Sequence, residues 1–226
     1  MSSDLVCPYC GGVLKKEPKA NTKCPQCGKI IYVRKKQPFF DRNLLTEEDM
    51  LISDEFVMLS SLWGWGITRD TYEETKAMLS KRFGTEASWG DVAWSIYAQL
   101  TDEFARVPDF EKLATIYACM AAHLHNRHRA HRQCALEYHR YRIMLFREHG
   151  FRKVRIDAHP YGCEACEALR DKTYTINEDL IKNPPLPPEN CACQLTKSWD
   201  AGYCMCQLVA EDLDQKAMLR HLGLKG

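Results

Sequence analysis

The sequence predicts an α-rich α+β protein in which a central helical bundle lies between two small cysteine-rich modules. Ten of the twelve cysteines fall within residues 7–27 and 163–206. Between these stretches, apolar residues recur at the three- and four-residue spacing that is typical of helices. The run Ile30-Ile31-Tyr32-Val33 has high β-propensity and directly follows the first cysteine stretch. The expected domains are a module at residues 1–35, a helical domain at 44–149 and a cysteine-rich module at 150–226.

Length and composition exclude several classes of protein. A chain of 226 residues is long enough for one or two domains, and its 45% hydrophobic and 27% charged content is that of a globular protein. No apolar run approaches the ~18 residues that a membrane helix needs, and Met1-Ser2-Ser3-Asp4 lacks the apolar core of a signal peptide. We therefore expect a cytoplasmic protein without a membrane partner.

The first cysteine stretch repeats one short motif. Cys7-Pro8-Tyr9-Cys10-Gly11 and Cys24-Pro25-Gln26-Cys27-Gly28 both read C-P-x-C-G, in which proline sets a turn and glycine lets the chain curl back. The stretch resembles the zinc-ribbon family over about residues 5–35. Four soft thiolates suit a closed tetrahedral site, so we expect a structural zinc ion bound by Cys7, Cys10, Cys24 and Cys27. The alternative, a pair of thioredoxin-like redox motifs, needs a strand–helix setting, and no helical periodicity accompanies these motifs.

The second cysteine stretch holds more thiols than one metal ion needs. The expected ligands are Cys163, Cys166, Cys191, Cys193, Cys204 and Cys206. Either four of them bind one zinc ion and two are spare, or all six hold a two-metal cluster. We favour the single ion, because the two thiols of a C-x-C pair do not easily both take good ligand directions. The sequence does not show which four bind, and His159, an alternative ligand, is more typical of an ordinary loop residue.

The same region resembles a known module. The order of its parts is similar to that of the C-terminal module of the phage Mu F-like minor head proteins. These parts are a short strand (154–159), the C-E-A-C motif at Cys163, a turn into a second strand (172–174), a proline-rich approach (185–191) and a closing C-x-C at Cys204. This sequence departs from that family in lacking a glycine at 170–172, in having Met205 where arginine is typical and in carrying an extra C-x-C. The resemblance implies a role in phage or prophage head assembly.

The middle of the chain predicts several helices. Thr46-Glu47-Glu48-Asp49 is typical of a helix start, with acidic side chains at the positive end of the helix dipole. Helical spacing recurs at 68–82 and 89–106, and Pro108-Asp109 starts a further helix. The sequence leaves open whether this last helix continues or breaks near Asn126.

A histidine- and arginine-rich stretch begins at His123. His125 and His128 are one helical turn apart and offer a metal site, but neighbouring arginines oppose a cation, so a solvated basic face is favoured. A nucleic-acid surface is the remaining interpretation, formed by Arg127, Arg129, Arg132, Arg140 and Arg142. Pairing of these charges with the acidic helical domain is equally compatible with the sequence.

We therefore expect a zinc-binding structural or adaptor protein with two zinc sites, a protein partner and no enzymatic activity. Nucleic-acid binding through the zinc ribbon and the basic block at 123–155 is the main alternative. A metal-dependent hydrolase that uses the histidines is a further one, although the chain lacks a Gly-rich phosphate loop, a G-x-S-x-G motif and an H-E-x-x-H motif.

Overall fold

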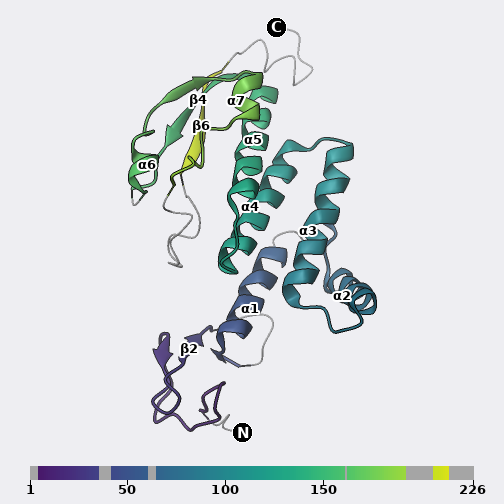
Figure 1. Cartoon of the computed structure of the whole chain (residues 1–226), viewed down its shortest axis with the longest axis vertical. Coiled ribbons are helices and arrows are strands. Elements are labelled where there is room, and N and C mark those ends of the chain that lie inside the picture. The colour runs from purple at the N-terminus through teal and green to yellow at the C-terminus, as the bar shows by residue number, and fades with distance from the viewer. Residues whose placement is uncertain (1–4, 36–41, 61–64, 161, 192–205, 214–226) are drawn as a thin grey trace. The chain divides into compact units, whose positions relative to one another are not determined.

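The computed structural model describes residues 5–35, 42–60, 65–160, 162–191 and 206–213. For residues 55–60 and 213 within these ranges, it describes the backbone alone. Over these residues the protein is a mixture of helix and sheet, with seven helices and two small three-stranded sheets (Figure 1). This confirms the mixed α+β class. The chain divides into two compact units, residues 1–93 and 94–226, which are described separately. Within the described ranges, none of the helices is long and apolar enough to cross a membrane.

A small antiparallel sheet forms beside the first cysteine stretch. Its strands are β1 (Thr22–Lys23), β2 (Ile30–Val33) and β3 (Leu44–Leu45), with β2 in the middle. Ile31, Val33 and Leu44 share one face of the sheet and pack with the buried Cys7 and Cys24. The strand predicted at residues 30–33 is confirmed, and β3 lies at the start of the range expected to be helical.

Helix α1 (Glu47–Ser60) begins at the predicted start. Thr46 and Asp49 cap it reciprocally, because the Thr46 hydroxyl accepts the Asp49 N–H at 3.1 Å and the Asp49 carboxylate accepts the Thr46 N–H at 3.0 Å. The Tyr9 hydroxyl accepts the N–H of Glu47 at 2.8 Å. The first C-P-x-C-G motif is thereby joined to the first turn of the helix.

Helices α2 (Arg69–Phe83) and α3 (Trp89–Arg106) lie close to the two ranges that their apolar spacing predicts. The Thr68 side chain caps the start of α2, and Gly84 ends it with a φ of +71°, a left-handed conformation that favours glycine. Tyr72 stacks on Trp89 with 4.4 Å between ring centroids, which joins α2 to the first turn of α3. Helix α3 runs through the division between the two units.

The long helical stretch breaks near Asn126, which resolves the question that the sequence left open. Helix α4 (Phe110–Asn126) begins at an Asp109 cap, and α5 (Arg132–Glu148) follows a turn in which His128 has a φ of +55°. The two helices lie side by side (Figure 1). Tyr117 stacks on Tyr141 with 5.5 Å between ring centroids, so the pair is held by aromatic as well as aliphatic packing.

The second sheet is antiparallel in the order β5-β4-β6, and α5 packs against it. Its strands are β4 (Phe151–Asp157), β5 (Thr173–Thr175) and β6 (Gln207–Leu213), and the short helices α6 (Glu164–Glu167) and α7 (Glu178–Lys182) flank β5 in the sequence. Ile143 of α5 lies in one buried cluster with Val154, Ile156 and Leu208. The same cluster contains buried cysteines, so the core of this unit is continuous with its candidate metal ligands.

Candidate metal centres

The first cysteine stretch brings all four predicted ligands together. The sulfur atoms of Cys7, Cys10, Cys24 and Cys27 lie within 4.8 Å of one another. Cys7 and Cys24 are buried, whereas Cys10 and Cys27 are exposed. Four thiols at this spacing are positioned to bind one metal ion.

The two C-P-x-C-G motifs fold in the same way. In the first, the Cys7 N–H donates to the Gly12 carbonyl at 2.8 Å and the Gly11 N–H donates to the Cys7 carbonyl at 2.9 Å. In the second, the N–H groups of Cys24 and Gly28 make the equivalent bonds, at 2.8 and 2.9 Å. Gly11 and Gly28 have φ values of +69° and +72°, which explains why glycine follows the second cysteine of each motif.

Electrostatics within the cluster favour a cation. Backbone N–H groups of Cys27 and Gln26 lower the pKa of the Cys24 thiol to about 6, and the Gln26 N–H lies 3.4 Å from its sulfur. At Cys10 a backbone hydrogen bond at Gly12 lowers the pKa, but desolvation and the neighbouring thiols outweigh it and raise the pKa to about 11. The Cys24 thiolate therefore forms readily, whereas the Cys10 thiolate is disfavoured, and a bound cation would stabilise the thiolate form of both.

The second cysteine stretch forms a second cluster. The sulfur atoms of Cys163, Cys166 and Cys191 lie within 4.8 Å of one another, with 3.8 Å between Cys163 and Cys191 and 3.6 Å between Cys166 and Cys191. Cys163 caps the start of α6, and Cys166 lies on that helix. These three thiols are also positioned to bind a metal ion.

Cys206 lies beside this cluster. It is buried, and its sulfur accepts the backbone N–H of His159 at 3.3 Å. A Cβ atom built on Gly162 would lie 3.6 Å from the Cys206 sulfur and 3.7 Å from the Cβ of Cys166, so the two cysteines flank the same glycine. The two remaining predicted ligands, Cys193 and Cys204, lie outside the described residues.

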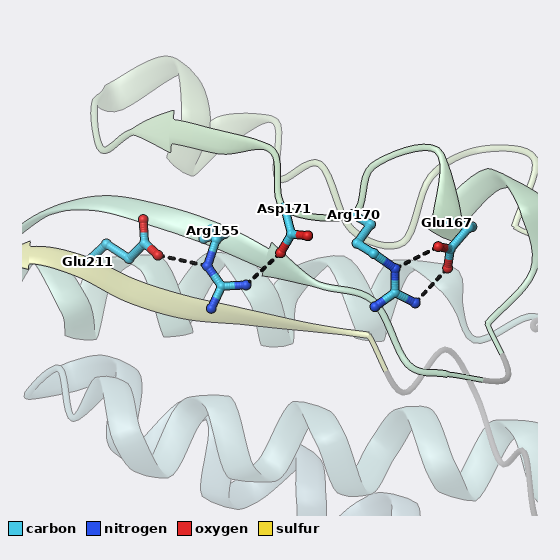
Figure 2. A network of polar contacts seen from close by, with 5 residues as sticks. All are labelled: Arg155, Glu167, Arg170, Asp171 and Glu211. Atoms are coloured by element: carbon cyan, nitrogen blue, oxygen red, sulfur yellow. Dashed lines mark hydrogen bonds and ion pairs between the residues drawn. The ribbon is translucent and has the colours of Figure 1, made fainter.

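Two groups of ion pairs involve α6, the turn after it, β4 and β6 (Figure 2). Arg155 of β4 bonds Glu211 of β6 at 2.7 Å and Asp171 at 2.9 Å. Arg170 makes two bonds of 2.6 Å to Glu167, the residue that follows Cys166. These pairs join β4 to β6 and to the turn after α6, and they join that turn to α6 itself.

The turn after α6 contains a residue in a left-handed conformation. Asp171 adopts a φ of +58°, a left-handed conformation that aspartate tolerates better than most residues. The Asp171 N–H bonds the Ile156 carbonyl, and the Ile156 N–H bonds the Lys172 carbonyl, both at 3.0 Å. Aspartate therefore takes the conformation that glycine would supply, with Arg155 as an additional anchor.

The histidine-rich stretch lies around the turn between α4 and α5. His123 is buried against Trp94 and Tyr97, and the rings of His125 and His131 meet edge to face with 5.0 Å between centroids. Within the described ranges, the groups of three or more potential metal ligands are the two cysteine clusters, and the histidines are not among them.

We predict that His125 makes the second unit sensitive to acid. Burial lowers the pKa of His125, and the charges of His131 and His128 lower it further. The unfolded chain then binds a proton more readily than the folded one, so this stability is present above about pH 6.5 and is lost as the pH falls below it. His125→Gln is expected to lose less stability than the wild type between pH 7 and pH 5, by at most about 1.4 kcal/mol per pH unit. Parallel urea-unfolding curves of the two proteins across this range would contradict the prediction.

The arginines proposed as a nucleic-acid surface differ in their surroundings. Arg129 is exposed and Arg127 half-buried, whereas Arg132, Arg140 and Arg142 donate to backbone carbonyls of distant segments. Their acceptors are the carbonyls of Pro187, of Ile181 and Lys182, and of Leu208. Further along the basic block, ion pairs to acidic residues of the same unit join Arg147 to Glu178, Arg152 and Lys153 to Asp212, and Arg155 to Asp171 and Glu211.

We predict that Arg140 is the most important of these arginines for stability. Its guanidinium reaches the carbonyls of Ile181 and Lys182, both at 3.1 Å, and so satisfies the last turn of α7. Arg140→Met is expected to lower the free energy of unfolding by about 1–3 kcal/mol, because two charge-assisted hydrogen bonds are lost. Arg147→Met is the matched control, since it removes an ion pair between the same two helices whose side chains are 43% and 72% exposed, and it should cost under about 1 kcal/mol. Equal losses in the two variants, measured by chemical denaturation, would contradict this ranking.

Comparison with known protein families, curated proteins and solved structures finds no match to this chain.

Proposed function

We propose that this chain is a zinc-binding structural or adaptor protein with one zinc ion in each cysteine cluster. The observation that carries the proposal is the first cluster, in which two identically folded motifs bring four sulfur atoms within 4.8 Å. An all-thiolate set of four is the ligand set typical of structural zinc, and it leaves no coordination position open for water or substrate. We propose that the region around this cluster, about residues 5–35, is the zinc ribbon that the sequence predicts.

The second zinc ion is assigned to Cys163, Cys166, Cys191 and Cys206. The first three sulfur atoms already form a group, and Cys206 is supported as the fourth ligand by its burial beside Cys166. Its sulfur also accepts a backbone N–H, as Cys24 does in the first cluster. Such N–H donors stabilise a metal-bound thiolate.

Two closed metal sites suit a role in which the modules hold surfaces rigid for a protein partner. The setting we propose is phage or prophage head assembly. It is supported by the order of β4, the C-x2-C motif at α6 and strand β5, which follows the module that the sequence resembles. The carbonyl bonds of Arg132, Arg140 and Arg142 support a protein partner over nucleic acid, because these guanidinium groups already have structural acceptors.

Metal content tests the proposal directly. Native mass spectrometry of the full-length protein, purified without chelator, is expected to show two zinc ions per chain. Mass spectra of Cys10→Ser and Cys163→Ser are expected to show one each, whereas Cys119→Ser, at a thiol outside both clusters, should retain two. A metal-free chain that stays metal-free when zinc is added would overturn the proposal.

The partner class is tested by salt dependence. Titration with a fluorescent mixed-sequence DNA duplex at several salt concentrations is expected to show no tight binding near physiological salt. An affinity that falls steeply with salt, at a log–log slope of ~0.9 per phosphate contact, would instead place nucleic-acid binding first.

A further inference from the structure

A ring nitrogen of one buried histidine in the second unit lacks a hydrogen-bond partner among the described residues. His139 on α5 is 2% exposed, and its Nδ1 atom makes no hydrogen bond there. Burying such a group without a partner is unfavourable, because its bond to water is lost and not replaced. An unsatisfied buried ring nitrogen therefore calls for an explanation.

The topology places His139 next to Cys206. Arg142 of α5 bonds the carbonyl of Leu208 on β6 at 3.5 Å. Strand β4 follows α5 directly and packs back along it, and β6 is antiparallel to β4, so α5 and β6 run in the same direction. His139 lies three residues before Arg142 on the helix, a rise of about 4.5 Å. Cys206 lies two residues before Leu208 along the strand, about 7 Å.

The packing of α5 agrees with this placement. His139 lies one helical turn before Ile143 and so on the same face of the helix. Ile143 belongs to the buried cluster that contains Cys166, Cys191 and Cys206. His139 therefore extends the core-facing side of α5 toward the cysteines.

The His139 imidazole and the Cys206 thiol also interact electrostatically. Burial lowers the pKa of His139 to about 3, Arg142 lowers it further and the charge of Cys206 opposes the shift. A neutral imidazole carries one ring N–H. A neutral donor can bond a thiolate without competing with the metal ion for it.

A buried all-thiolate site needs such donors. Four thiolates around one divalent ion leave a net negative charge, and Cys166 and Cys206 are 0% and 1% exposed. The Cys206 sulfur accepts the backbone N–H of His159 in the structure. We propose that His139 is a positioning residue of the second metal centre, and that its ring N–H donates a hydrogen bond to the Cys206 thiolate when the ion is bound. This inference rests on the proposed function of that site.

Cadmium-113 NMR of the full-length protein tests the inference. The wild type loaded with cadmium should give two resonances, one of which is coupled to the ring N–H proton of His139. His139→Phe is expected to weaken cadmium binding at that centre about 10–100-fold in competition with a chelator, and His139→Asn, which keeps a donor, should recover part of the loss. His123→Phe replaces another buried histidine of the same unit and should leave both resonances and both affinities unchanged.

Each outcome has a distinct meaning. Unchanged affinity in His139→Phe, with no coupling in the wild type, overturns the role of His139 and leaves the metal site standing. A cobalt-loaded wild type whose spectrum shows three sulfur ligands and one nitrogen at this centre also overturns it, because His139 would then bind the metal directly. A single cadmium resonance in the wild type overturns the second metal site itself. Where His139→Phe does not fold, the wild-type coupling decides the question.

Discussion

Cys24→Ser is expected to unfold the first metal module, residues 5–45, and to leave residues 94–226 folded. The buried cluster of this module consists of Cys7, Leu14, Cys24, Ile31 and Leu44, so two of its five members are proposed metal ligands. The aliphatic core that remains is too small to offset the conformational entropy of the segment. Zinc binding contributes about 10–16 kcal/mol in comparable small modules, and removing one ligand forfeits much of it.

The measurement is an amide proton–nitrogen correlation spectrum. The dispersed signals of the module should collapse in Cys24→Ser, and chelator should have the same effect on the wild type. Cys119→Ser is the matched control, because Cys119 is a half-buried thiol of α4 outside both clusters. A module that stays folded in both Cys24→Ser and the chelated wild type would falsify the metal assignment.

Cys166→Ser is expected to cause the largest loss of stability in the second unit. Its thiol is fully buried in the cluster that contains Ile156, Leu186 and Leu208. The substitution leaves a hydroxyl in an apolar site, at a cost of about 1–3 kcal/mol. It also removes the metal ion, which adds about 4 kcal/mol when free zinc is a thousandfold above its dissociation constant. At ~3 °C per kcal/mol for a unit of this size, the Tm should fall by more than roughly 10 °C.

Cys134→Ser separates the two contributions. Cys134 is buried on α5 in the same unit but lies outside the cysteine clusters, so its replacement adds the polar penalty and keeps the metal. Thermal unfolding in zinc-containing buffer, followed by metal analysis of the folded fraction, measures both effects. Similar Tm values for the two variants would mean that the second cluster contributes no metal-dependent stability.

The sequence predicts best those features whose determinants lie close together in the chain. Helix α3 spans the predicted range 89–106, because its apolar spacing and flanking glycine and serine residues are local signals. The four ligands of the first cluster are recognisable for the same reason, since each pair lies within one four-residue turn. The break between α4 and α5 stays open in the sequence because it depends on the left-handed conformation of His128.

The second cluster depends on long-range pairing that no short motif encodes. The pairing of β6 with β4, about fifty residues earlier, brings Cys206 to the same glycine that Cys166 flanks, and the sequence does not predict β6. Similarly, Arg140 and Arg142 belong to a basic stretch, yet their acceptors lie some forty to sixty-six residues further along the chain. His139 was missed as well, although its four-residue spacing from the buried Ile143 is the signal that would have found it.

The pairing of β4 with β6 has a consequence for the order of folding during synthesis. The first metal module has its four ligands as soon as Cys27 has left the ribosome, and the loop between Cys10 and Cys24 is short and inexpensive to close. In the second unit, β4 lacks one of its two neighbours until residues 207–213 have been made. Until then one edge of β4, which is rich in arginine, lysine and aliphatic side chains, lacks its native partner. An unpaired edge of this kind favours chaperone binding or mispairing. Early metal capture by Cys163, Cys166 and Cys191 would shorten that interval by holding the adjacent turn in place before β6 arrives.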